Sequence, residues 1–255
     1  MSIDYTASAA LVEKGDPDRF LATMAAAPEL RGGLFAMAAY NLELARAPWA
    51  SKEPMIAEMR LQWWRDLVEE LGQGSVPRSH EITESLAHLV THHGISPTLL
   101  DEMAEARRWD AYSEPFEDQD DFDGYMDHTS GHLLWAACQT LGAQPADERS
   151  VRDYAYGVGV ANWLAAVADL VERGKIPLLD GRPEGVQTLA QDALKRLKSA
   201  KPPRKLAPAL RWGWQAEPLL NLAIKSPGRV GDGAHYLPEL SRKLRLMRLS
   251  MLGRY

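Results

Sequence analysis

The chain has 255 residues, of which 45% are hydrophobic and 25% are charged. This balance is ordinary for a globular protein and allows one large helical domain or two small ones. The net charge of −6 argues against a generally basic nucleic-acid-binding protein, so no nucleic-acid partner is expected. A single cysteine, Cys138, excludes an internal disulfide and fits a reducing environment.

No uninterrupted run of 18 apolar residues occurs, so the sequence predicts no membrane-spanning helix. The first residues include Asp4, Glu13, Asp16 and Asp18 without an apolar stretch, which makes a signal peptide unexpected. Together these features predict a cytoplasmic protein.

Apolar residues recur every three or four positions, helix-capping residues separate the segments, and nothing reads as a strand. At Asp16-Pro17, for example, a capping side chain precedes a proline at the first helical position. The pattern predicts an all-α, single-domain protein over residues 1–255. The expected helices cover about residues 17–26, 31–47, 51–72, 79–92, 97–109, 122–141, 146–173 and 238–251.

The helix before Gly174 is apolar on almost every side, which is typical of the middle of a bundle. Its spacing places Asn162, Ala166 and Asp169 on one face, and its many small residues allow close neighbours or a cavity. After it, residues 180–186 and 198–208 are rich in turn formers, and the second stretch is expected to be a basic surface linker.

The last helix carries an apolar line at Leu240, Leu244, Met247 and Met251, surrounded by cationic residues. Docking of this helix on the bundle is the favoured interpretation. Peripheral contact with an anionic membrane, such as the inner membrane, is the alternative.

The run from Asn162 to Lys175 resembles the second aspartate-rich segment of the squalene/phytoene synthase family. It keeps Asn162, Asp169, Gly174 and Lys175, but it has Ala165, Ala166 and Leu170 where the family has Arg, Asp and Asp. In the segment that resembles the first aspartate-rich helix, Leu42, Glu43 and Arg46 stand at the acidic positions, and only Glu43 is acidic.

Other landmarks follow the family's order. Arg60-Leu-Gln-Trp63-Trp64-Arg65-Asp66 is similar to a family segment, and the likeness extends over about residues 17–180. The resemblance implies a helical bundle of the isoprenoid synthase type with a central cavity. It also implies an enzyme that joins two prenyl diphosphates with Mg²⁺, which neutralises the departing diphosphate.

One acid on each of the two facing helices is a poor clamp for a Mg²⁺ cluster. The acidic remnants Glu43 and Asp169, with Asn162, are therefore not assigned as catalytic. No cofactor is expected, and Mg²⁺ belongs only to the enzymatic alternative.

The basic residues leave a second interpretation open, in which a diphosphate is bound without metal. The candidates for that role are Arg46, Arg60, Arg65 and Lys175. The simpler interpretation is that Glu43 and Arg46, three residues apart on one helix, pair with each other.

Candidate cavity-wall residues are Tyr40, Trp63, Trp64 and Tyr125. Trp63 and Trp64 are adjacent, so one is expected in the core and the other on a cavity wall or at a partner contact.

Two histidine pairs have the spacing of a helical metal site, His128 with His132 and His88 with His92. No third ligand is evident near either pair in the sequence, so no metal site is expected.

Three functions remain. The first is a catalytically degenerate family member that binds a protein partner or ligand. Its closest counterpart is the family branch that contains a mitochondrial complex I assembly factor, which implies a role in respiratory-complex assembly. The second is an active prenyltransferase that makes phytoene or squalene. The third is a carrier of an apolar isoprenoid or lipid.

Overall fold

A computed structural model describes residues 3–51, 53–112 and 114–255. Within these ranges the chain is all-α and contains no strand, which confirms the predicted fold class. The helices are α1 (Thr6–Gly15), α2 (Pro17–Met24), α3 (Arg31–Arg46), α4 (Pro54–Gly72), α5 (Thr83–His93), α6 (Pro97–Ala106), α7 (Arg108–Ala111), α8 (Gln119–Met126), α9 (His132–Gln139), α10 (Glu148–Glu172), α11 (Pro183–Ser199), α12 (Ala207–Leu210), α13 (Ala216–Lys225), α14 (Gly228–Gly231) and α15 (Glu239–Met251). A π-helical turn, η3 (Asp127–Gly131), joins α8 to α9, and short 3₁₀ turns occupy Pro28–Leu30, Ala47–Trp49, Pro145–Asp147, Arg204–Leu206 and Arg211–Gly213.

Local sequence signals set several helix ends. The Asp16 carboxylate accepts a hydrogen bond of 3.0 Å from the backbone N–H of Arg19, which caps α2. Gly174 follows α10 with φ of 81°, a left-handed conformation that glycine adopts without steric cost. These positions were predicted because their signals lie within a few residues of the helix end.

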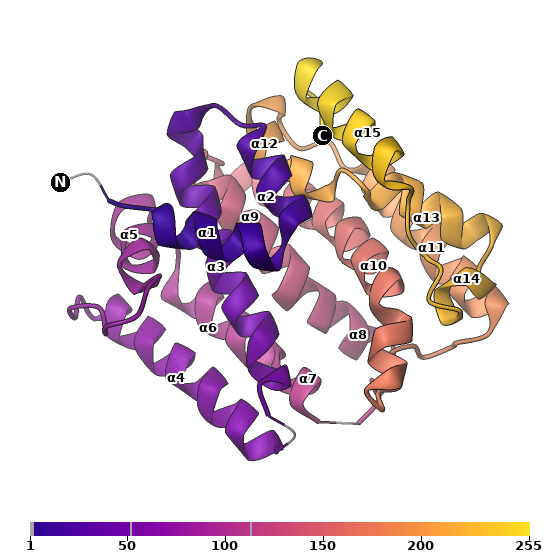
Figure 1. Ribbon diagram of the computed structural model, residues 1–255, viewed down its shortest axis with the longest axis horizontal. Coiled ribbons are helices and arrows are strands. Elements are labelled where there is room, and N and C mark those ends of the chain that lie inside the picture. Colours follow the sequence, from indigo (N-terminus) through magenta and orange to yellow (C-terminus); the bar gives the residue numbers. More distant parts are fainter. Residues whose placement is uncertain (1–2, 52, 113) are drawn as a thin grey trace.

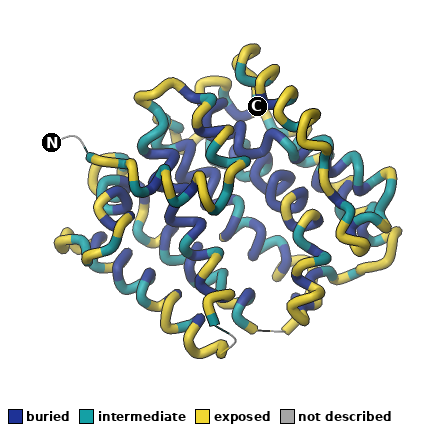
Figure 2. Tube along the Cα trace, viewed as in Figure 1, coloured by how far each residue is buried: buried dark blue, intermediate teal, exposed yellow. Residues whose placement is uncertain are grey.

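Helix α10 lies between the N-terminal helices α1–α7 and the C-terminal helices α11, α13, α14 and α15, whereas the short α12 lies beside α2 and α9 (Figure 1). Its buried side includes Val151, Leu164 and Val167, and the buried residues gather around it in the middle of the molecule (Figure 2). Helices α11 and α13 pack against it from the C-terminal side. The sequence did not predict α11, which begins within the turn-rich stretch 180–186, or α13, and the predicted surface linker includes the buried Leu206.

The described part of the chain contains one helix, Pro145–Glu172, that is long and apolar enough to cross a membrane by length and composition. Of its apolar window, 67% is buried inside the molecule, as in the core helix of a bundle. The sequence did not indicate this helix as a possible span because isolated polar residues such as Asn162 interrupt its apolar residues.

The helix predicted over 122–141 is broken by the π-helical turn at residues 127–131. The Thr129 hydroxyl donates to the carbonyl of Tyr125, and the Ser130 hydroxyl donates to the carbonyl of Ala155 on α10. A Cβ at Gly131 would lie 2.4 Å from Oδ1 of Asp127, so glycine makes room for that carboxylate. Side-chain hydrogen bonds to backbone carbonyls compete with regular helix geometry, which accounts for the break.

The last helix, α15, packs on the bundle with its apolar line turned outward. The apolar line of α15 faces solvent, with Leu240, Leu244, Met247 and Met251 exposed by 51–79%. The helix is instead held by its arginines: Arg242 pairs with Asp18 at 2.6 Å, and Arg245 pairs with Glu217 at 3.1 Å. The helix therefore lies on the bundle, as favoured from the sequence, but its apolar line faces away from it.

Candidate functional site

The two helices that carry the remnants of the aspartate-rich segments are α3 and α10. Glu43 is half-buried on α3, and Asp169 is exposed on α10 in line with the exposed Asn162. Leu42 and Leu170, at positions where the family has acids, are only 9% and 7% exposed. Two positions at which the resemblance implies metal-binding acids are therefore buried apolar positions in this chain.

These residues do not fit a Mg²⁺ cluster. Among the described residues, neither Glu43 nor Asp169 belongs to a group of three His, Cys, Asp or Glu side chains close enough to share one ion. Magnesium is held by oxygen ligands in near-ideal octahedral geometry, usually through one or two carboxylates with phosphate oxygens and water. A single carboxylate at the motif positions of each helix does not supply this for several ions, so no chemical step is derived through Mg²⁺.

Several predicted residues come together in a pocket of about 380 Å³ between α3 and α4. The Arg46 guanidinium lies 3.9 Å from the Glu43 carboxylate, in the pairing expected for residues three apart. The pocket is lined by Glu43, Arg46, Ala47, Ala50, Arg60, Trp63, Trp64 and His80. Two exposed arginines beside an indole could receive an anion, but one of them already faces an acid.

The adjacent tryptophans take different environments. Trp64 is buried, with its ring centroid 5.6 Å from that of Tyr40. Trp63 is half-buried and packs edge-on against Trp64 at 4.8 Å. Tyr40 itself is fully buried, and its hydroxyl donates to the carbonyl of Leu100 at 2.9 Å. Tyr40 is therefore a core residue and not part of a cavity wall.

Arg65, a predicted diphosphate ligand, is instead paired with two acids of α6. Its Nε and Nη2 donate to the two oxygens of Asp101 at 2.7 and 3.1 Å, and its Nη1 donates to Glu105. This fork geometry uses three donors of the guanidinium. Arg65 therefore joins α4 to α6, and its donors are not directed toward a ligand.

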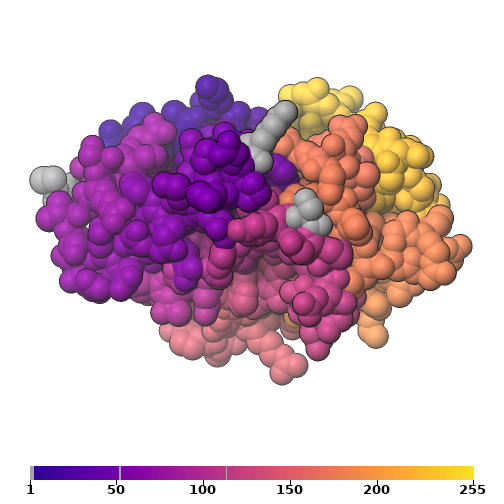
Figure 3. Space-filling view, turned by 90° about the horizontal axis from the view of Figure 1, so that it is seen from below, coloured from indigo at the N-terminus to yellow at the C-terminus, as the bar shows by residue number. Residues whose placement is uncertain are grey.

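Lys175 is also occupied. It is 6% exposed, its ammonium donates to the carbonyl of Tyr112, and it lies 5.6 Å from the ring centroids of both Trp49 and Trp109. Burial lowers the pKa of Lys175 below its usual value of 10.5. The neighbouring Arg173 lies 4.6 Å from the Trp49 ring. These contacts join the end of α10 to the residues before α4 and after α7, at the face seen in Figure 3.

An aromatic cluster fills the interior between α7, α8 and α10. The rings of Trp109 and Phe116 stack at 4.4 Å, and Trp163 lies 5.3 Å from Tyr125 and 5.4 Å from Trp109. The Trp163 indole N–H donates to the carbonyl of Pro177 at 2.8 Å. Tyr125, a candidate cavity-wall residue, is 7% exposed within this cluster. The rings occupy space that an apolar ligand would otherwise take.

Sequence reasoning missed the polar groups beside that cluster. Asp110 is 4% exposed and accepts a hydrogen bond of 2.9 Å from the Tyr125 hydroxyl. The guanidinium of Arg107 donates to both, at 3.3 Å to Asp110 and 3.0 Å to Tyr125. Burial raises the pKa of Tyr125 well above its usual value, so the phenol keeps its proton. The only signal in the sequence was an acidic residue next to Trp109 and two residues before Tyr112.

Comparison with solved structures identifies the fold. A dehydrosqualene synthase in complex with a ligand superposes with a TM-score of 0.75 at 13% identity, over 97% of this chain and 95% of that one. Squalene synthase HpnC from Alicyclobacillus acidocaldarius gives a TM-score of 0.64 at 12% identity, over 98% of this chain and 94% of that one. At this identity the likeness shows the fold alone, and it confirms the isoprenoid synthase type of bundle.

Comparison with known sequences identifies relatives. The chain is similar to the complex I assembly factor 6 homolog of Drosophila melanogaster, with 26% identity over 74% of this chain and 58% of that protein. It is also similar to human complex I assembly factor 6, with 26% identity over 52% of this chain and 39% of that protein. The chain thus spans about two fifths to three fifths of the length of these relatives. The model of the squalene/phytoene synthase family matches residues 12–179, which is more than half of the sequence. The chain belongs to the squalene/phytoene synthase family.

Proposed function

We propose that this protein is a catalytically degenerate family member that takes part in the assembly of respiratory complex I by binding a protein partner. The observation that carries the proposal is the state of the two motif helices, where Leu42 and Leu170 are core residues and Glu43 and Asp169 remain as single acids. The names of the relatives, complex I assembly factor 6, support the same role.

The physical reason concerns the leaving group. Ionisation of an allylic diphosphate places charge on the departing oxygens, and this charge must be neutralised where it develops. The cations near the site do not replace a metal cluster: Arg65 is bound by two acids, Lys175 is buried against indole rings, and Arg46 faces Glu43. A function through binding therefore agrees better with the side chains than turnover does.

Gene deletion and rescue test the proposal. Deleting the gene in its host should lower the amount of assembled complex I on native gels, and the wild-type gene should restore it. The double variant Glu43→Gln, Asp169→Asn should restore it equally well, because the proposed role does not use these carboxylates. Normal complex I after the deletion, or a folded double variant that fails to rescue, would contradict the proposal.

An apolar pocket favours a second candidate function, the binding of an isoprenoid or lipid. The pocket has a volume of about 490 Å³, within the usual range for small-molecule sites, and most of its lining is apolar. It lies beside the end of α10 and is lined by residues such as Val167, Val171, Ile176, Val186 and Val230. Mass spectrometry of solvent extracts from the purified protein decides this candidate: a carrier yields a stoichiometric apolar compound, and a protein without this role yields none.

We also propose where the protein acts: in the cytoplasm, in peripheral contact with the inner membrane. The solvent-facing apolar line of α15 is flanked by the exposed cations Lys243 and Arg248. Apolar side chains beside cations are typical of helices that lie on anionic lipid surfaces. Sedimentation with anionic vesicles should therefore be reduced by Leu244→Ser together with Met247→Ser, and undiminished sedimentation of that variant would contradict this setting.

A further inference from the structure

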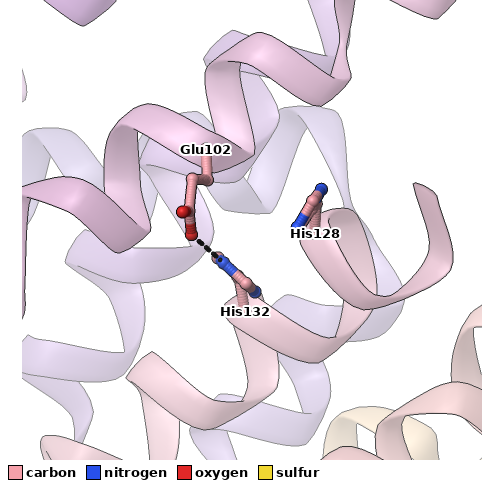
Figure 4. Close-up of side chains that lie close together, drawn as sticks. All are labelled: Glu102, His128 and His132. Atoms are coloured by element: carbon pink, nitrogen blue, oxygen red, sulfur yellow. Dashed lines mark hydrogen bonds and ion pairs between the residues drawn. The ribbon is translucent and has the colours of Figure 1, made fainter. Parts of the chain in front are cut away.

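A carboxylate and two imidazoles meet at the π-helical turn, away from the two motif helices. Glu102 lies on α6, and His128 and His132 lie within and directly after η3 (Figure 4). Nε2 of His132 is 2.7 Å from Oε2 of Glu102, and the two imidazole ring centroids are 5.0 Å apart. One ligand atom from each residue lies within 4.8 Å of the others. The sequence did not indicate this third ligand because Glu102 is far from the histidines along the chain.

We propose that Glu102, His128 and His132 bind a zinc ion. Two imidazoles and one carboxylate form a ligand set that zinc uses when a fourth position stays open for water or another ligand. Zinc–ligand distances of about 2.0–2.1 Å in a tetrahedral site imply ligand atoms roughly 3.3 Å apart. Glu102 and His132 need to separate by only about half an ångström from their hydrogen-bonded distance, and His128 has to move closer. His128 is exposed and Glu102 is half-exposed, so both side chains have room to adjust.

The surroundings of His132 suit this role. Zinc-binding histidines donate their second ring N–H to a backbone carbonyl or a carboxylate, which fixes the ring. Nδ1 of His132 lies 3.1 Å from the carbonyl oxygen of Asp127 and 2.9 Å from Nη1 of Arg152. Without metal, Arg152 donates to Nδ1 and Nε2–H donates to Glu102. With zinc on Nε2, the ring takes the other tautomer and Nδ1–H donates to the Asp127 carbonyl, which requires Nη1 of Arg152 to turn away from Nδ1 toward the carboxylates of Asp127 and Glu148.

The local charge also permits a cation. Arg152, whose Nη1 lies 2.9 Å from Nδ1 of His132, is neutralised by Asp127 at 3.0 Å and Glu148 at 2.8 Å. Glu102 then adds a further negative charge on the side where the zinc would lie. The attraction of the ion to Glu102 is therefore not offset by an unpaired arginine beside it.

The π-helical turn distinguishes this pair from the other histidine pair. π-Helical turns are rare and frequently mark functional sites. On the regular helix α5, His88 and His92 have the same spacing, but their rings stack nearly parallel at 4.5 Å. Within the described residues, that pair belongs to no three-ligand group. It is therefore a matched internal control.

Isothermal titration of the metal-free full-length chain with zinc chloride tests the site. The wild type should bind one equivalent. Glu102→Gln and His128→Ala should each weaken binding by at least about 100-fold, because loss of an outer-shell partner alone costs about 10- to 100-fold. His92→Ala should bind like the wild type. Both altered ligands are partly or fully exposed, and circular dichroism of the metal-free variants verifies that they fold.

A second readout uses cobalt(II) in place of zinc. The wild type and His92→Ala should develop the visible absorption of a low-coordinate cobalt site, and the two ligand variants should not. A wild-type chain without stoichiometric zinc binding overturns the proposal. So does a folded Glu102→Gln or His128→Ala variant that binds zinc as tightly as the wild type. Neither result bears on the role in complex I assembly, which does not use these residues.

Discussion

Replacing Leu170 by aspartate, the residue type expected there from the family pattern, should destabilise the protein and should not restore prenyl transfer. Leu170 on α10 is 7% exposed and belongs to the core. Replacing it by aspartate removes the burial of one leucine side chain, which is worth about 1.5–3 kcal/mol. It also places a carboxylate without a designed partner in an apolar site, which costs several kcal/mol more or forces the group to bind a proton. We expect the free energy of unfolding to fall by at least about 4 kcal/mol, a large part of the roughly 5–15 kcal/mol typical of natural proteins.

Urea unfolding followed by circular dichroism measures this loss. Ala165→Asp is the matched control, because Ala165 lies on the same helix but is exposed. Its expected cost is about 0.7 kcal/mol, from helix propensity alone. If the free energy of unfolding of Leu170→Asp lies within about 1 kcal/mol of that of the control, position 170 still accepts an acid. The inference that packing has replaced metal binding there would then be refuted.

Two further predictions concern predicted ligands that the structure places in internal contacts. Arg65→Ala should lower the free energy of unfolding by about 1 kcal/mol, or Tm by about 2–4 °C, because the partly exposed ion pairs with Asp101 and Glu105 on α6 are lost. Arg60→Ala, at an exposed position on the same helix, should change the free energy of unfolding by less than about 0.5 kcal/mol in the same thermal scan. Equal effects of the two substitutions would contradict the assigned role of Arg65. Tyr125→Phe should cost about 1.5–3 kcal/mol in urea unfolding, because the buried Asp110 carboxylate loses a donor. An unchanged midpoint would show that Asp110 does not depend on that hydroxyl.

The parts of the fold that could be predicted are those with local signals. Asp16-Pro17 and Gly174 mark helix ends through the conformations of single residues, so the sequence alone was sufficient to place them. The family likeness rested on motifs spread along the chain in the expected order, and the family model and the solved structures confirm it. The scarcity of acids on the motif helices was also visible in the sequence, because it depends on residue identity and not on packing.

The parts that could not be predicted depend on contacts between distant segments. From the sequence, Arg65 was a candidate ligand for a diphosphate, because the packing of α6 beside α4, which supplies its partner Asp101, is not encoded locally. Glu102 became a neighbour of His132 for the same reason, across 30 positions of the chain. The orientation of α15 was misjudged because periodicity identifies an apolar line but not whether that line faces the bundle. In this helix Leu246 is buried on the docked side, and Arg242 and Arg245 form ion pairs there.

Release of diphosphate tests the absence of prenyl transfer most directly. The purified, unmodified chain is incubated with farnesyl or geranylgeranyl diphosphate and Mg²⁺, and released diphosphate is measured beside an extraction for coupled hydrocarbon. We expect no release above the rate without protein, because Glu43 and Asp169 are the only acids at the motif positions of α3 and α10. Mg²⁺-dependent release at about 1 s⁻¹ or faster, the range of ordinary enzymes, would contradict the proposed loss of catalysis.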